Sequence, residues 1–439
     1  AAVNTLTGTS AELTTMLNGQ ALTTNATGFT GFNAAEAIVL SDAITRATAE
    51  TAMAATTAGV TATISDTLAN FVQLTETALH AFTYQVSETT VDAANVLLAD
   101  ARSTVAIDLS NVTSVTGDFT EIQDMYQAAG FASTGHTAAS PVTLTGLGNE
   151  AISADDATIA VASANILDAF TSGPVTATIA TGVESVLDGL NGAGNAYTLN
   201  VDDDTSVDIT ALLSLNTKTT AAVNLALVDT DNATLLTGTY SEIKSLFSMA
   251  QNGEFSNLAT NLPITVEDTG ISVSQANEIN ALTTGAVTAA INTGDMATLN
   301  SLEGTGNVYA ITVADASGDM GELNALNAKT NGVLTVAAVN TLTGTNAELT
   351  TMLNGQALTT NASGFTGFNA AEAIILSDAS VTRLQADTAA AATTGLVTAT
   401  VAAGTLAANN AFVDAGGQVN NLSFTLTDTT AVAATLNAL

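Results

Sequence analysis

The sequence AAVNTLTGTSAELTTMLNGQALTTNATGFTGFN at residues 1–33 returns at residues 337–369 as AAVNTLTGTNAELTTMLNGQALTTNASGFTGFN. The two stretches agree at 31 of 33 positions, at an offset of 336 residues. Self-similarity at a long fixed period is the signature of a repeat protein. This pair therefore indicates a chain built by duplication.

The motif Leu/Val-Thr-Gly-(Thr/Asp)-x-x-Glu inside that stretch divides the offset into smaller repeats. Its glycine occurs four times, at spacings of 109, 121 and 106 residues, as Gly8, Gly117, Gly238 and Gly344. The long repeat is therefore about 112 residues. We predict four blocks joined in one continuous solenoid, with bounds at 1–103, 104–220, 221–332 and 333–439.

Each block divides again into four segments, A to D, that share one local pattern. Segment A carries the glycine motif, and the others begin with β-rich stretches such as AIVLSD (37–42), VTATI (60–64) and YQVSET (84–89). An Ala/Leu-rich stretch with apolar spacing of three and four follows, and it closes near Thr-Gly. The pattern predicts a strand, an N-cap, a short helix and a glycine C-cap, the last at Gly59, Gly173, Gly285 and Gly395.

A strand-plus-helix unit of roughly 22 residues is too small to bury its apolar face alone. Stacked units would place their strands in a long parallel sheet and their helices in a second layer, so the predicted fold class is an α/β solenoid. The alternative is an all-β solenoid in which the Ala-rich stretches are loops or strands. Capping-box spacing favours the α/β fold. It occurs at Thr9/Glu12, Asp118/Glu121, Thr239/Glu242 and Thr345/Glu348.

Charge and composition argue against several classes of partner. The chain has 6 Lys plus Arg against 41 Asp plus Glu, a formal net charge of −35. Nucleic acid and anionic membrane surfaces require clustered basic residues, so neither is expected as a partner. No apolar run is long enough to insert into a membrane, and the lack of cysteine excludes disulfides and thiolate metal sites. We interpret the acidity as a solvated face that keeps an apolar array soluble.

Several of these motifs resemble a known class of repeats. LTGTxxE, ITVEDT (264–269), LTDTT (426–430) and the LNAL…TTG linkers are similar to the tandem repeats of very large secreted surface proteins of marine bacteria, cyanobacteria especially. The resemblance covers nearly the whole chain. It implies an extracellular or cell-surface location and a structural or adhesive role, and it supplies no active-site residues.

The sequence predicts no catalytic residue and no cofactor. Its two histidines are His80, in a stretch that we interpret as helical, and His136, in a loop-like stretch. Neither has a second histidine at metal-ligand spacing, and no G-x-S-x-G nucleophile motif occurs. We therefore do not expect an enzyme.

Acidic residues that follow the B and D strands are the main candidates for a binding site. In a stacked array they form a column, with B and D members two strands, or roughly 10 Å, apart. We interpret each as an N-cap favoured by the helix dipole. The alternative is calcium, which needs about six to eight oxygen ligands. The calcium candidates are Asp42, Asp203, Asp268, Asp315, Asp378 and Asp428, with Glu88 in the same column.

Two functions agree with these features. The first is a structural repeat segment of an extracellular filament, surface layer or stalk, which assembles through stacked or lateral repeat contacts. The alternative is a rod-like spacer of a giant cell-surface adhesin, with calcium as a potential stabiliser. Val3 and Leu6 at one end, and Leu436 and Leu439 at the other, resemble interior repeat positions. We therefore expect both ends to be covered by further repeats or further copies.

Overall fold

The computed structural model describes residues 3–20, 22, 29, 31–32, 34–74, 80–103, 105–133, 137–202, 205–228, 235–356, 358, 364–409 and 420–436. The chain forms two compact units. The first unit comprises residues 1–202, 214–227 and 253–257, and the second comprises 203–213, 228–252 and 258–439. The unit boundary therefore does not follow the boundaries between the predicted blocks. The prediction that all four blocks form one continuous solenoid stays a prediction.

Strands and short helices alternate within each unit, and we call each strand with its following helix a coil. The A strands are β1 (Thr5–Gly8), β7 (Ser114–Gly117), β14 (Leu235–Gly238) and β21 (Thr341–Gly344). They precede α1 (Ser10–Leu17), α5 (Phe119–Ala128), α9 (Tyr240–Gln251) and α13 (Asn346–Leu353). The B strands are β2 (Ala37–Ile44), β9 (Ala151–Ala154), β16 (Ile264–Val266) and β23 (Ala373–Leu376). They precede α2 (Arg46–Ala55), α6 (Val161–Phe170), α10 (Val273–Asn280) and α14 (Arg383–Ala392).

The helices of the C coils have 4 residues each, and three of the D coils have a second strand. The C strands are β3 (Val60–Asp66), β10 (Val175–Thr178), β17 (Val287–Ala290) and β24 (Val397–Gly404). They precede α3 (Leu68–Phe71), α7 (Glu184–Leu187), α11 (Met296–Leu299) and α15 (Leu406–Asn409). The D strands are β4 (Ala81–Val86), β11 (Ala196–Thr198), β18 (Val308–Thr312) and β25 (Asn421–Leu426). The second D strands are β5 (Thr90–Asp92), β12 (Ser206–Asp208) and β19 (Ser317–Asp319).

The D helices are α4 (Ala93–Asp100), α8 (Ile209–Lys218), α12 (Met320–Asn327) and α16 (Ala433–Leu436). Two-residue strands follow three of the D helices, as β6 (Ile107–Asp108), β13 (Val223–Asn224) and β20 (Leu334–Thr335). Two-residue strands also follow three of the A helices, as β8 (Leu144–Thr145), β15 (Phe255–Ser256) and β22 (Phe365–Thr366).

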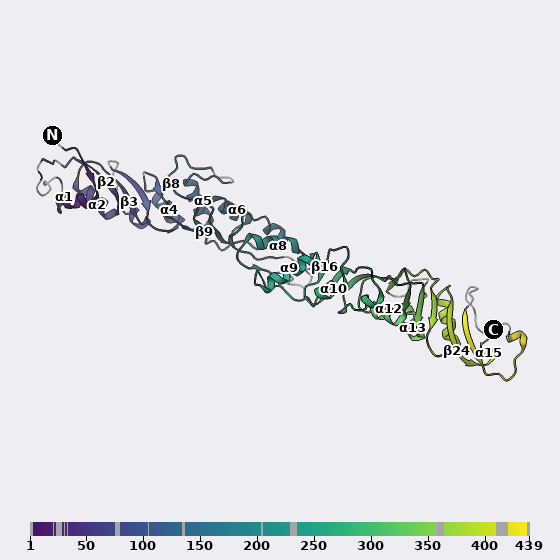
Figure 1. Ribbon diagram of the computed structural model, residues 1–439. Helices are drawn as coiled ribbons and strands as arrows, with labels where there is room; N and C mark the ends of the chain where they lie inside the picture. The colour runs from purple at the N-terminus through teal and green to yellow at the C-terminus, as the bar shows by residue number, and fades with distance from the viewer. Residues whose placement is uncertain are drawn as a thin grey trace. The chain divides into compact units, whose positions relative to one another are not determined.

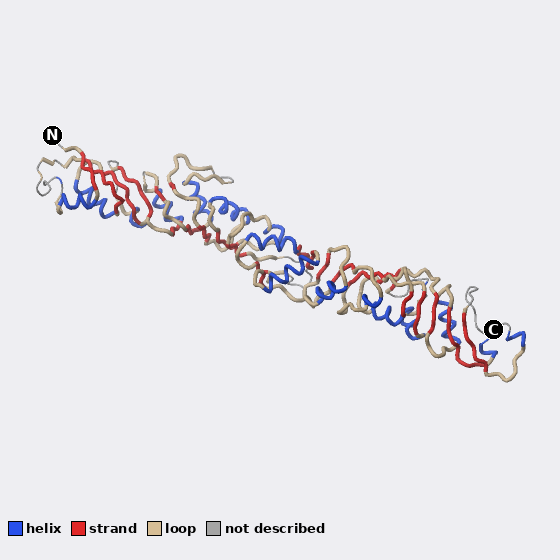
Figure 2. Tube along the Cα trace, viewed as in Figure 1, coloured by secondary structure: helices blue, strands red, loops and turns tan. Residues whose placement is uncertain are grey.

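Every described strand pairing is parallel, and strands of successive coils are neighbours. The first unit contains sheets β1-β2-β3-β4-β6-β8, β11-β10-β9-β7-β5 and β13-β15. The second contains β12-β14-β16-β17-β18-β20-β22 and β19-β21-β23-β24-β25. Within the first unit, α1 and α2 lie on one side of β2 and β3 (Figure 1), and within the second, helices again line one side of the strands (Figure 2).

The core lies between the strands and the helices because each element presents one apolar face. In β3, Val60, Ala62 and Ile64 are buried while the threonines between them face outward, which is the period of two expected of a strand. Helix α14 buries Ala386, Ala389 and Ala392 at helical spacing. Small alanine faces let a helix lie close to the sheet. The α/β solenoid arrangement is therefore confirmed, and the all-β alternative is wrong.

The predicted glycine C-caps are wrong in their chemistry. Gly173, Gly285 and Gly395 are absent from the glycines with positive φ, so they do not end helices in the left-handed conformation. Glycine is needed at these positions instead because the backbone of an earlier segment lies too close for a Cβ atom. A Cβ atom at Gly395 would lie 2.4 Å from the carbonyl oxygen of Ala371, and one at Gly285 would lie 2.4 Å from that of Asn261. Gly59 likewise has no positive φ.

Threonines after the B helices, and after the D helices α8 and α12, bond the corner of the chain to the corner one coil earlier. The Thr393 hydroxyl donates to the carbonyl oxygen of Glu372 at 2.6 Å and accepts from the Gly395 N–H at 2.9 Å. Both bonds satisfy backbone groups that the tight corner would otherwise leave without partners. The same pair of bonds occurs at Thr56, Thr171, Thr219, Thr283 and Thr330.

Candidate functional site: carboxylates between successive coils

Carboxylates near the end of a strand, or just after it, accept hydrogen bonds from the helix one coil earlier. Asp378, for example, accepts from the backbone N–H of Asn346, the first residue of α13, at 2.7 Å. We call this contact the cross-coil cap. The acids at the other cross-coil caps are Asp42, Asp66, Glu88, Asp156, Asp268, Asp315 and Asp428.

The cross-coil caps follow the repeat. All four A helices are capped by an acid of the next B segment, at N–O distances of 2.7 to 2.8 Å. Among the C helices, α3, α11 and α15 are capped by an acid of the next D segment. The first N–H groups of a helix lack partners inside the helix and carry partial positive charge. A carboxylate placed there satisfies a donor and complements the helix dipole at once.

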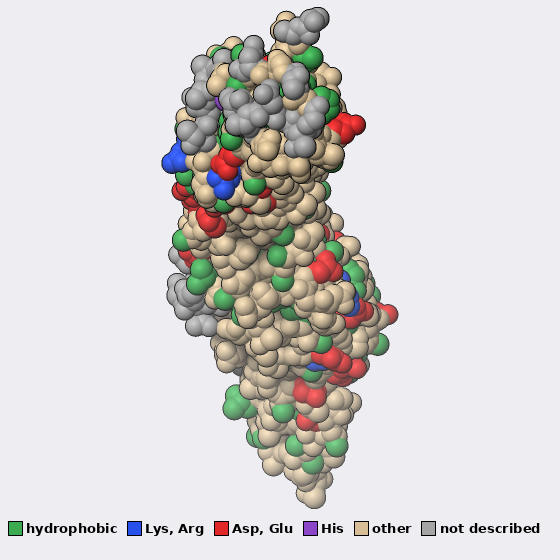
Figure 3. All heavy atoms as spheres, turned by 90° about the vertical axis from the view of Figure 1, so that its left-hand side faces the viewer, with side chains coloured by type: hydrophobic (Ala, Val, Ile, Leu, Met, Phe, Trp, Pro, Cys, Tyr) green, Lys and Arg blue, Asp and Glu red, His purple; other side chains and the backbone are tan. Residues whose placement is uncertain are grey.

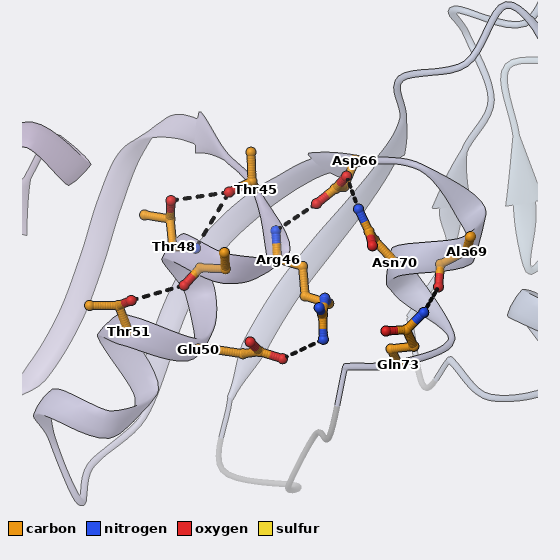
Figure 4. A network of polar contacts seen from close by, with 10 residues as sticks. Thr45, Arg46, Thr48, Glu50, Thr51, Asp66, Ala69, Asn70 and Gln73 are labelled. Atoms are coloured by element: carbon orange, nitrogen blue, oxygen red, sulfur yellow. Dashed lines mark hydrogen bonds and ion pairs between the residues drawn. The ribbon is translucent and has the colours of Figure 1, made fainter.

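Asp66 shows the geometry of one cross-coil cap closely (Figure 4). Its Oδ2 accepts from the Arg46 N–H of α2 at 2.8 Å, while its Oδ1 accepts from the Asn70 side-chain amide at 2.7 Å. Partial burial pushes the pKa of Asp66 upward, but the hydrogen bonds from Asn70, Arg46 and Thr67 outweigh burial and leave the pKa below its ordinary value. One charged side chain therefore holds the starts of two successive helices.

The N-cap interpretation of these acids needs a correction. The predicted acids do sit at helix N-termini, but at those of the preceding helices. Asp42 lies inside β2, and the N-cap of the following helix is Thr45. Likewise Ser272 and Thr382 cap the helices that follow Asp268 and Asp378. The strand ends beside the preceding helix, and further residues are needed before the chain turns into its own helix.

The capping boxes predicted from the A motif are all present. Thr9, Asp118, Thr239 and Thr345 each accept from the N–H of the glutamate three residues on, whose side chain returns a bond to the cap backbone. Every A helix therefore starts with a local cap and a cross-coil cap. At α1 the Ser10 hydroxyl and N–H both donate to Asp42, and these bonds hold the pKa of Asp42 below its ordinary value.

The structure gives the calcium alternative no cluster of ligands. Among the residues that the structure describes, no group of three or more His, Cys, Asp or Glu side chains is arranged to hold a metal ion. Asp42, Asp268, Asp315, Asp378 and Asp428 each face a helix N–H group instead. The sixth calcium candidate, Asp203, lies outside the described residues.

A second recurring contact joins the C strands to the D segments. The side-chain oxygens of Asn195, Asn307 and Asn420 accept from the first N–H of the C strand one coil earlier, at 2.8 to 3.0 Å. In the first block His80 takes this position, and its Nδ1 accepts from the Val60 N–H at 3.1 Å. Because Nδ1 is an acceptor, the imidazole is neutral in this contact. Burial lowers the pKa of His80, which favours the same form.

The structure changes the interpretation of His80. His80 directly precedes strand β4 and stacks on Phe82 with ring centroids 5.5 Å apart, so the helix predicted at this position is wrong there. The sequences His-Ala-Phe, Asn-Ala-Tyr and Asn-Val-Tyr place His80 at the position before the D strand that asparagine occupies in other blocks. This equivalence is the signal that could have identified the role of His80. His136 lies outside the described residues.

Basic residues form a contact that the sequence reasoning missed. Arg102 donates to the Val72 carbonyl oxygen at 2.9 Å, and Lys329 donates to the Asn300 and Leu302 carbonyl oxygens at 2.5 and 2.8 Å. Val72 and Asn300 are the C-caps of α3 and α11, so the cations complement the negative helix ends. An alignment of the blocks that treats lysine and arginine as equivalent would have placed Arg102, Lys218 and Lys329 at the same position.

Acidic side chains outnumber basic ones on the face drawn in Figure 3, as the composition requires. In the part of the chain that the structure describes, no helix has the length and apolar character needed to cross a membrane. No protein-family model, no curated protein and no solved structure matches the chain.

Proposed function

We propose that the chain is a structural repeat segment of an extracellular filament, surface layer or stalk, and that it works through repeat contacts rather than catalysis. The observation that carries the proposal is recurrence. The cross-coil cap occurs at all four A helices, and the Asn or His acceptor occurs at all four C strands. The polar side chains with the most regular placement are thus engaged in holding one coil to the next.

Two further features support a structural role. The outward positions of the strands are rich in threonine, and the acids that remain exposed give a strongly negative surface. Such a surface stays solvated and repels nonspecific aggregation, which suits a long-lived extracellular material. The sequence has two histidines that could serve in acid–base catalysis. One of them, His80, is engaged in an inter-coil contact.

Electron microscopy of the source cells with antibodies against this chain tests the proposal. We expect label on filaments, sheets or stalks of constant width, and competition with the purified chain should remove that label. Label on isolated tethers that end in a distal domain would support the adhesin-spacer alternative instead. Label confined to the cell interior would contradict both the location and the function.

A further inference from the structure

The first coil has an apolar face that the described residues leave uncovered. Strand β1 pairs with β2 on one edge, and among the described residues nothing pairs with its other edge. Val3 is 49% exposed, and Leu6 and Met16 are partly exposed. Leu6, Leu13 and Met16 line a cavity of about 80 Å³ on this face. The face therefore combines an open strand edge with an apolar hollow.

The fourth block shows what covers the same sequence. There Val339 is 1% exposed, and Leu342 and Met352 are 0% and 1% exposed. The covering elements are β19 and α12 of the preceding D coil. Strand β19 pairs with β21 through Ser317–Thr341, Gly318–Leu342 and Asp319–Thr343. The face of the first coil is therefore shaped for a D coil.

The chain carries a second D coil whose matching side is exposed. Val308 and Asn421 pair with equivalent C-strand residues, Thr288 and Thr398. This register places Thr430, Ala431 and Val432 at the positions of Ser317, Gly318 and Asp319, and Ala433 at that of Met320. Gly318 and Met320 are buried, but residues 429–434 are exposed, with Val432 at 67%.

Ala433 is a suitable residue for this junction even though it replaces Met320. The junction between the first and second blocks also has alanine there. A Cβ atom at Gly117 would lie 3.1 Å from the Cβ atom of Ala93, and the buried Ala93 and Val96 of α4 lie in the D coil whose strand β5 pairs with β7. An alanine-faced D helix can therefore pack against an A coil.

We propose that the face of the first coil formed by Val3, Leu6, Leu13 and Met16 binds the D coil at residues 428–436 of a second copy of this chain. The contact repeats the junction of β19 and α12 with β21 and α13, and it orders copies head to tail. Thr430, Ala431 and Val432 of one copy pair with Thr5, Leu6 and Thr7 of the next. This inference rests on the proposed structural function and specifies how copies meet.

A disulfide cross-link tests the register directly. Because the chain has no cysteine, only introduced thiols react. Strand neighbours are about 4.8 Å apart, within the reach of a disulfide. The double variant Thr5→Cys/Thr430→Cys should therefore give, under mild oxidation, a ladder of multimers on a non-reducing denaturing gel. The matched control is Thr5→Cys/Leu384→Cys, since Leu384 is 73% exposed on the B helix α14.

A variant without cysteine gives an independent test by sedimentation of the full chain. Leu6→Glu places a charge in the uncovered face, where the chain already tolerates water, and should weaken association by about tenfold or more. Leu384→Glu should leave association unchanged. Equal ladders from both cysteine pairs, no ladder from either, or a monomeric wild-type chain would overturn the inference.

The two proposals fail in different ways. Multimers that Leu6→Glu leaves intact would overturn the head-to-tail contact but would leave a structural role through lateral contacts. The microscopy of source cells decides the structural role separately.

Discussion

Residues 3–20 and 339–356 have the same sequence except at Ser10 and Asn346, and yet they have different surroundings. Strand β21 lies between β19 and β23, whereas β1 has one described neighbour, β2. Leu342 of β21 is fully buried, whereas Leu6 of β1 is partly exposed. Both helices nonetheless keep the same capping box and an αL C-cap asparagine.

The difference separates what the local sequence determines from what the neighbouring coil contributes. Capping boxes form at both positions because their groups lie within four residues of one another. Burial of the leucine requires a preceding coil, and among the described residues β21 has one while β1 does not. The secondary structure is therefore local, and much of the stability belongs to the junctions between coils.

The largest predicted effect comes from truncating the two equivalent leucines. Leu342→Ala should cost about 2 to 4 kcal/mol, because it leaves a cavity in a covered junction. Leu6→Ala should cost about 1 kcal/mol or less, since this side chain is already partly in water. Urea unfolding of both variants measures the difference. Equal losses would mean that the preceding coil does not stabilise this strand.

A second pair of variants should lower the stability of the two regions to a similar extent. The cross-coil caps Asp42 and Asp378 come from the following coil, which is present at both positions. Asp42→Ala and Asp378→Ala should therefore lower the melting temperature by similar amounts, each less than Leu342→Ala. A much larger loss for Asp378→Ala would show that the preceding coil also supports this contact.

The cap in the first block also predicts an acid dependence. The folded-state pKa of Asp42 is below its ordinary value of 3.8, so its contribution is complete above about pH 4. That contribution is lost as the pH falls through the folded-state pKa. The Asp42→Ala variant should thus lose less stability than the wild-type chain on acidification below pH 4.

The smallest effect concerns the acceptor at His80 in the first block and Asn420 in the fourth. Because the pKa of His80 is lowered by burial, the folded state favours the neutral imidazole. Its contribution is full above the unfolded pKa of about 6.5 and declines as the pH falls below that value. His80→Asn copies the other blocks and should abolish this dependence, measured by thermal melts between about pH 5 and 8. A slope that persists in His80→Asn would contradict the assignment.

The fold class was predictable because strand, cap and helix signals repeat in register. Thr345 and Glu348 fixed a helix start from sequence alone, and the structure places α13 there. The glycine prediction failed because sequence does not distinguish a positive φ from close approach. Gly395 is required by a carbonyl oxygen more than 20 residues earlier in the chain, a distance that local patterns do not report.

The candidate site was predicted by residue but not by partner. Asp268 was correctly identified as an acid for a helix N-terminus, yet it serves α9, which precedes it, at 2.7 Å from the Tyr240 nitrogen. Assigning the partner requires knowing how the end of a strand meets the helix of the previous coil. Aligning the four blocks would have shown the role of His80, because asparagine replaces it in the other three.

Hydrogen–deuterium exchange on the two equivalent peptides tests the central claim, that a preceding coil rather than local sequence protects a strand. The measurement compares residues 3–17 with 339–353 in dilute solution, where copies are separate, and mass distinguishes them through Ser10 and Asn346. We predict that amides of β21 exchange more than about tenfold more slowly than those of β1. Equal exchange of the two strands would contradict it.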